Sequence, residues 1–89
     1  MGLGRVKTLL HDADRRGRTQ ATAIRELIAL AVAITLRCDG CIAVHTAAAK
    51  KHGATKEEIA EALGVGISVN AGAALVYSTR TLDAFDAAA

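Results

Sequence analysis

Two cysteines and one histidine lie close together near the middle of the chain, in the stretch Cys38-Asp39-Gly40-Cys41-Ile42-Ala43-Val44-His45. Two cysteines separated by two residues can close a small disulfide ring or bind a metal ion together. On a helix, Cys41 lies one turn after Cys38, and His45 lies one turn after Cys41. A histidine at this spacing can take the proton from a thiol and return it. The pattern therefore favours redox or nucleophilic chemistry, or metal binding.

The reactivity of these thiols depends on where a helix begins. If a helix begins at Gly40, both thiols lie near its amino end, where the helix dipole favours the negatively charged thiolate. Cysteines in such settings can have a pKa roughly one to several units below the ordinary value of about 8.5. Thiolate is the reactive form of cysteine, so this placement would make the pair chemically active.

The composition limits the chain to one small domain. Of its 89 residues, 52% are hydrophobic and only 2% are aromatic, so alanine and aliphatic side chains must supply the core. A domain of this size buries a modest core, and we expect oligomerisation to add stability. The net charge of +2 is too small to indicate a nucleic-acid partner. The sequence has no proline, which permits long helices.

The sequence predicts no export signal and no membrane partner. The residues before Asp12 lack the apolar segment of a signal peptide, and the apolar run Leu27–Leu36 is too short to cross a bilayer. We therefore expect a soluble, cytoplasmic protein. In a reducing compartment a CxxC pair is more often catalytic or metal-binding than a structural disulfide.

Helical periodicity predicts an all-α fold with two parts. Residues 1–20 form a variable arm with a short amphipathic helix that ends near Gly17, and residues 21–89 form a helical domain. No strand pattern competes with this prediction. The apolar residues of the arm helix are Leu3, Val6, Leu9 and Leu10.

The domain is predicted to consist of antiparallel helices, with the cysteine pair near the amino end of a core helix. The first core helix runs from Thr22, its N-cap, to Leu36, and it is apolar on nearly every side. The second covers 39–52 and stops at Gly53.

The carboxyl-terminal part is predicted to hold two more helices. Thr55 and Glu58 form a capping box that begins the third helix. That helix is expected to break at Asn70-Ala71-Gly72. A fourth helix then carries Leu75, Leu82 and Phe85.

These segments resemble the carboxymuconolactone decarboxylase-like, or alkylhydroperoxidase D-like (AhpD-like), proteins. The resemblance covers about residues 22–86. It rests on Arg-Glu-Leu-Ile-Ala-Leu-Ala at 25–31, on Cys-x-x-Cys-x-x-x-His at 38–45, and on Gly-Ala-Thr-x-Glu-Glu-Ile-x-Glu-Ala at 53–62. A glutamate twelve residues before the first cysteine, followed by this capping box, is far more specific than CxxC alone. Members of the family are all-helical and usually assemble as trimers or as hexamers built from trimers.

The resemblance implies a thiol-dependent peroxidase. In the family pattern the second cysteine, here Cys41, attacks a hydroperoxide and becomes a sulfenic acid, which the first cysteine, Cys38, resolves as a disulfide. His45 and Glu26 form a proton relay. Periodicity alone would instead favour Glu26 as an ordinary exposed acid near the start of its helix. The resemblance further implies a hydroperoxide substrate, an unidentified thiol or dithiol reductant, a homo-oligomer and no cofactor.

Two features depart from the family pattern, and one geometric condition applies. The best-known peroxidase members have a second histidine just before the second cysteine, where this chain has Gly40, and residues 1–20 match nothing in the family. In one straight helix Glu26 would lie roughly 18 Å from Cys38, too far for a relay. We therefore expect the chain to reverse near Cys38–Gly40, which Gly40 would permit, or a neighbouring subunit to supply one group.

Three alternatives compete with the peroxidase prediction. A zinc site could use Cys38, Cys41 and His45 with Glu26 or His52 as the fourth ligand, although structural zinc sites usually draw ligands from two separate loops. Lactone decarboxylation, the activity of the family's namesake, is disfavoured by the cysteine pair. The last alternative is a non-catalytic assembly protein whose cysteines only pack.

Overall fold

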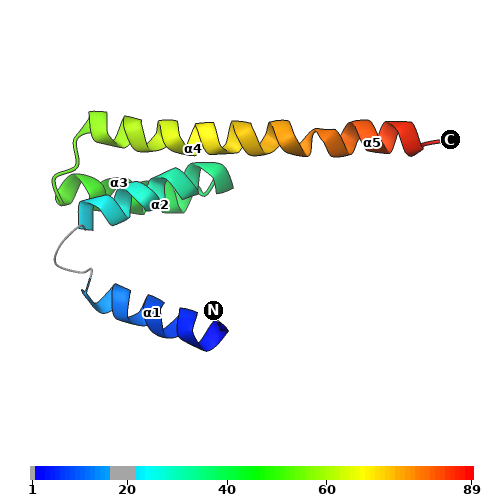
Figure 1. Cartoon of the computed structure of the whole chain (residues 1–89). Helices are drawn as coiled ribbons and strands as arrows, with labels where there is room; N and C mark the ends of the chain where they lie inside the picture. The colour runs from blue at the N-terminus through cyan, green and yellow to red at the C-terminus, as the bar shows by residue number, and fades with distance from the viewer. Residues whose placement is uncertain (1, 17–21) are drawn as a thin grey trace.

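The computed structural model describes residues 2–16 and 22–89, which form five helices and no strand (Figure 1). The helices are α1 (Leu3–Arg16), α2 (Thr22–Leu36), α3 (Asp39–Lys51), α4 (Lys56–Tyr77) and α5 (Thr79–Ala87). The chain reverses after α2, so that α3 runs antiparallel to it, and α4 turns back to lie along α2. α2 packs against both α3 and α4, α5 contacts the end of α4, and α1 belongs to none of these packed pairs. The predicted all-α fold is confirmed.

A small core lies where α2 meets α3 and α4. Leu30 and Ala33 of α2, Ala49 of α3 and Gly66 of α4 are buried. A Cβ atom at Gly66 would lie 2.9 Å from the carbonyl oxygen of Ala31, so only glycine lets the two backbones approach this closely. α2 is therefore the central element of the packed part of the chain.

The chain reverses between α2 and α3 through a residue in the left-handed conformation. Arg37 has a φ of 54°, the only positive φ among the described non-glycine residues. The amide of Cys38 donates to the carbonyl of Ala33, and the amide of Arg37 donates to that of Ile34. This is the Schellman pattern, which satisfies the last carbonyls of a helix. Gly40 was expected to permit the reversal, but it already lies inside α3.

The same hydrogen-bond pattern ends α3. Gly53 has a φ of 89°, which glycine adopts readily. The amide of Gly53 donates to the carbonyl of Lys50, and the amide of Ala54 donates to that of Ala49. The predicted stop at Gly53 is confirmed, and these bonds fix the carboxyl end of α3.

The predicted capping box begins α4. The hydroxyl of Thr55 accepts a hydrogen bond from the amide of Glu58, and the Glu58 carboxylate accepts one from the amide of Thr55. The hydrogen bond from the Thr55 backbone amide, and after it the interaction of the Thr55 hydroxyl with the carboxylate, hold the pKa of the Glu58 carboxyl below its ordinary value.

The predicted break at Asn70-Ala71-Gly72 is wrong, because α4 continues through it to Tyr77. Gly in a helix costs only about 1 kcal/mol relative to Ala, and the flanking alanine and aliphatic residues favour the helix. The interruption comes at Ser78, whose hydroxyl donates to the carbonyl of Ala74. The stretch Lys56–Ala87 is long and apolar enough to cross a membrane by length and composition, which is weak evidence because core helices of soluble proteins pass the same test.

Two predictions concern the start of the helical domain. Thr22 was expected to be the N-cap of the first core helix, but α2 already includes it. α1 extends to Arg16, and the predicted end of the arm at Gly17 lies outside the described residues. The division into residues 1–20 and 21–89 stays a prediction.

The close approach of α4 to α2 can be tested with a pair of glycine variants. Gly66→Ala should lower the free energy of unfolding by about 1–3 kcal/mol, because the new Cβ would press on the Ala31 carbonyl. In the matched control, Gly64→Ala, the added Cβ meets no atom within 4 Å. That variant should raise stability by up to about 1 kcal/mol through helix propensity. Urea unfolding followed by circular dichroism compares them, and equal stabilities would contradict the α2–α4 contact.

Candidate functional site

Cys38 and Cys41 are joined by a disulfide at the start of α3. Cys38 is the N-cap of this helix, and its sulfur accepts a hydrogen bond from the amide of Cys41, with an N···S distance of 3.2 Å. Both residues are partly buried, whereas Asp39 and Gly40 between them are exposed. The prediction that the pair lies near the amino end of a core helix is confirmed, with the helix starting at Asp39 and not at Gly40.

Glu26 of α2 and His45 of α3 form a hydrogen-bonded pair. The Nδ1 atom of His45 lies 2.5 Å from the Oε2 atom of Glu26. The Glu26 side chain is only 18% exposed, and that of His45 is 34% exposed. The first turn of α2 contains no acidic residue, and Glu26 lies beyond it. It is therefore not the exposed first-turn acid that periodicity alone favoured.

The pairing sets the chemistry of the imidazole. Because a carboxylate only accepts hydrogen bonds, Nδ1 of His45 is the donor and carries a proton. The other ring nitrogen, Nε2, is then the atom that can accept a proton when the ring is neutral. The carboxylate also holds the ring in place, as an acid does beside a catalytic histidine. His45 lies one turn after Cys41 on α3, so the two side chains share one face of the helix.

The backbone reversal solves the distance problem posed by the sequence. Because α3 returns along α2 after Arg37, residues 26 and 45 lie opposite each other on adjacent helices. The two groups meet within one chain, without a residue from a neighbouring subunit. The structure thus brings Glu26 together with His45 and joins Cys38 to Cys41, while the catalytic roles of the four residues stay predictions.

The residues proposed as zinc ligands do not form a metal-binding group while the two cysteines are joined by a disulfide. The two sulfur atoms are bonded to each other, so neither is a free thiolate ligand. Across residues 2–16 and 22–89, no three His, Cys, Asp or Glu side chains form a group that could hold a metal ion. His52, the proposed fourth ligand, is the exposed C-cap of α3.

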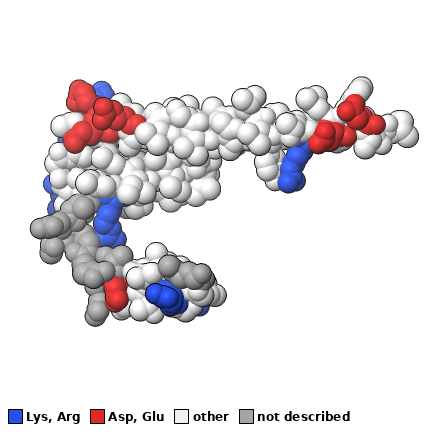
Figure 2. All heavy atoms as spheres, in the orientation of Figure 1, with Lys and Arg blue, Asp and Glu red and all other residues white. Residues whose placement is uncertain are grey.

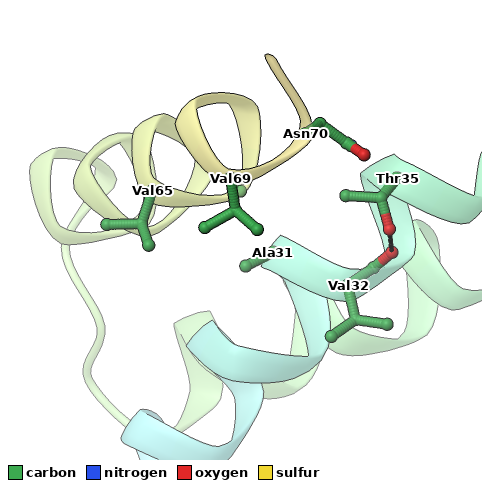
Figure 3. Close-up of a pocket in the computed structure, with 7 residues that line it drawn as sticks. Ala31, Val32, Thr35, Val65, Val69 and Asn70 are labelled. Carbon is green, nitrogen blue, oxygen red and sulfur yellow. Dashed lines mark hydrogen bonds between the residues drawn. The ribbon is translucent and has the colours of Figure 1, made fainter. Parts of the chain in front are cut away.

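An apolar pocket of about 300 Å³ between α2 and α4 was not predicted from the sequence. In Figure 3, Val69 of α4 projects toward Ala31 of α2, and the Thr35 hydroxyl donates to the carbonyl of Val32. Sequence periodicity could mark these residues as apolar, but it could not show which helices would face each other. The lining consists of Ala31, Val32, Thr35, Val65, Gly66, Val69 and Asn70.

Arg37 is the second feature that the sequence did not reveal. Nothing in its residue type signals a left-handed conformation, which costs most side chains roughly 1–2 kcal/mol. It precedes Cys38 directly, and it lines a second shallow pocket with residues of α2 and α4. The turn that begins α3 is therefore the part of the site least visible in the sequence.

The similarity of this chain to known proteins covers the residues of the candidate site. The chain matches the sequence model described as the carboxymuconolactone decarboxylase family over residues 9–84, so the match begins within the predicted arm. An uncharacterized protein of Cupriavidus necator is 42% identical over 65 residues, covering 73% of this chain and 58% of that protein. One of Haemophilus influenzae is 49% identical over 73 residues, covering 82% and 65%.

A third relative, named uncharacterized protein 4 in cox locus, comes from Paracoccus denitrificans. It is 40% identical over 62 residues, covering 70% of this chain and 56% of the relative. The chain thus spans less than two thirds of the length of these curated relatives.

The role of the Glu26 charge can be tested by Glu26→Gln, which keeps a hydrogen-bond acceptor beside His45. We expect the reduced protein to lose thiols to hydrogen peroxide about tenfold to a hundredfold more slowly, the size of effect seen when the carboxylate partner of a metal-binding histidine is removed. Stopped-flow thiol titration measures the rate. Glu57→Gln removes an exposed acid from the first turn of α4 and should leave it unchanged. An undiminished rate in Glu26→Gln would remove Glu26 from the relay.

Proposed function

Because this chain belongs to the carboxymuconolactone decarboxylase family, we propose that it is a thiol-dependent oxidoreductase that reduces hydroperoxides. The observation that carries the proposal is the CxxC disulfide on the same helix as a histidine held by a partly buried glutamate. A disulfide of this kind is one half of a dithiol cycle, and a histidine oriented by a carboxylate is suited to moving the protons that the cycle requires.

The proposed oxidation has two steps. The Cys41 thiolate attacks the terminal oxygen of the hydroperoxide, the O–O bond breaks, and the alcohol leaves with a proton from the charged His45. Cys41 is then a sulfenic acid. The Cys38 thiolate attacks its sulfur, hydroxide leaves and is protonated to water, and the disulfide forms. A thiol or dithiol reductant then returns both cysteines to the reduced state. Such reductants are available in the cytoplasm, where we expect the protein to act.

The cycle is tested by counting thiols. Reduced, metal-free protein treated with one equivalent of an organic hydroperoxide should lose two thiols per chain, and a dithiol should restore them. Cys41→Ser should lose none. Cys38→Ser should instead accumulate a sulfenic acid that dimedone traps. Full retention of thiols in the native sequence would overturn the peroxidase and shift weight to zinc binding, decarboxylation or assembly.

We also propose that the protein works as a homo-oligomer, because much of its apolar surface is uncovered. The chain exposes 7221 Å², whereas a compact protein of 9.2 kDa exposes about 4,900 Å². The excess, roughly 2,300 Å², is in the range that one subunit loses in an obligate assembly. Its radius of gyration of 17.6 Å likewise exceeds the roughly 12 Å of a compact domain of this length.

The uncovered surface is organised into ridges that suit helix packing. Ile24, Ile28, Val32 and Leu36 follow one another at four-residue spacing along α2, and each is 51% to 70% exposed. Rows at this spacing interdigitate with similar rows on a second helix. Figure 2 shows uncharged surface along the middle of α4, between the acidic cluster at its start and the charged residues of α5. A second copy of the chain presents the same apolar surfaces and is the occupant that we propose.

A charge placed on the α2 ridge tests the assembly. Val32→Glu should shift the mass measured by light scattering in detergent-free buffer toward that of a monomer, because the carboxylate would be desolvated at the interface. Ala60→Glu adds the same charge at an exposed position of α4 next to other acids and should leave the mass unchanged. A native chain that is monomeric, or that partitions into lipid vesicles, would overturn the proposal.

A further inference from the structure

The two sulfur atoms of the disulfide have different surroundings. The Cys38 sulfur caps α3 and accepts the amide hydrogen bond of Cys41, at 3.2 Å. The Cys41 sulfur belongs to the first turn of the same helix and lies one turn before His45. One sulfur therefore accepts a backbone hydrogen bond, and the other belongs to a residue one helical turn from an imidazole.

We propose that reduction of this disulfide has a fixed direction: the incoming thiol attacks Cys41, and Cys38 leaves as a thiolate held by the amino end of α3. The inference rests on the proposed function, since it concerns the step that regenerates the same dithiol. It assigns the mixed disulfide with the reductant to Cys41. The reductant is a thiol of low molecular mass or a protein dithiol, and both follow the same chemistry.

The leaving sulfur decides the direction of thiol–disulfide exchange. Exchange is faster when the departing thiol has a lower pKa, because the departing sulfur takes the electron pair of the broken bond. A thiolate at Cys38 would keep the amide hydrogen bond that the disulfide sulfur already accepts, and this bond strengthens when the acceptor is charged. The positive end of the α3 dipole adds to the effect. No backbone rearrangement is needed to create this stabilisation.

The charged groups around Cys38 do not cancel this effect. Arg37 precedes it with a positive charge, and Asp39 follows with a negative one, both exposed. On the α4 side, the residues that share a pocket with Arg37 are Ile67, Asn70, Ala71 and Ala74, none of them charged. His45 and Glu26 are engaged with each other. The backbone amide and the helix dipole are therefore the main asymmetry between the two sulfurs.

His45 serves the other sulfur. When a thiol approaches Cys41, the Nε2 atom of His45 can take its proton, because Nδ1 is committed to Glu26. The thiolate then attacks Cys41, the S–S bond breaks, and its electron pair goes to Cys38. A second thiol attacks the reductant's sulfur in the mixed disulfide and releases the Cys41 thiolate. In total, two thiols become one disulfide, and the protein gains two reduced cysteines.

The first test measures the two cysteines separately and needs no peroxide. Iodoacetamide labels the single-cysteine variants Cys41→Ser and Cys38→Ser over a range of pH. The midpoint for Cys38 should lie at least about one pH unit below that for Cys41. Adding His45→Ala should move the Cys41 midpoint and leave that of Cys38 in place, because backbone capping does not involve the imidazole. A lower midpoint for Cys41 than for Cys38 would overturn the proposal.

The second test reads the direction of attack in the native sequence. Oxidised protein is mixed with glutathione and quenched with N-ethylmaleimide, which blocks the sulfur that has just left. Trypsin cleavage after Arg37 and Lys50 yields one peptide that carries both cysteines, and tandem mass spectrometry assigns each modification. Glutathione should be on Cys41 and maleimide on Cys38, and the reverse would overturn the proposal. Neither test depends on peroxide turnover, so its failure is distinguishable from failure of the proposed peroxidase.

Discussion

The candidate site depends on the reversal of the backbone at Arg37. The left-handed conformation of this residue satisfies the last carbonyls of α2 and turns the chain so that α3 starts at once with Cys38 as its cap. The same turn brings α3 back along α2, which places His45 against Glu26. A single unfavourable backbone conformation, costing roughly 1–2 kcal/mol, is thus offset by hydrogen bonds and packing that the whole site uses.

Much of the fold could be predicted because it follows from local chemistry. The Thr55–Glu58 capping box and the Gly53 stop rest on hydrogen bonds within a few residues, so the sequence alone indicates them. The break expected at 70–72 did not form because glycine is only a mild helix breaker where its neighbours favour helix. The chain reverses at Arg37, whereas the sequence favoured Gly40, because glycine is the residue type expected at a positive φ.

Only part of the candidate site could be predicted from residue spacing. Spacing alone could pair Cys38 with Cys41, because both lie within one helical turn. The Glu26–His45 contact spans 19 residues and could be specified only by resemblance to a family, since periodicity does not determine how two helices face each other. The capping of α3 by the Cys38 sulfur depended on locating the helix start to within one residue, where sequence patterns are least accurate.

The fixing of α3 at both ends has a consequence for the energetics of the proposed redox cycle. The Cys38 sulfur caps the start of α3 and Schellman hydrogen bonds hold its end, and the Cα atoms of the two cysteines lie 5.2 Å apart across the first turn. At this separation the sulfurs can bond or part by rotation about the side-chain torsions, while the helix itself stays in place. The reorganisation energy of the redox change is then confined to a few side-chain atoms. In the proposed redox cycle, this chain of 89 residues would therefore alternate between its two covalent states without passing through a partly unfolded one.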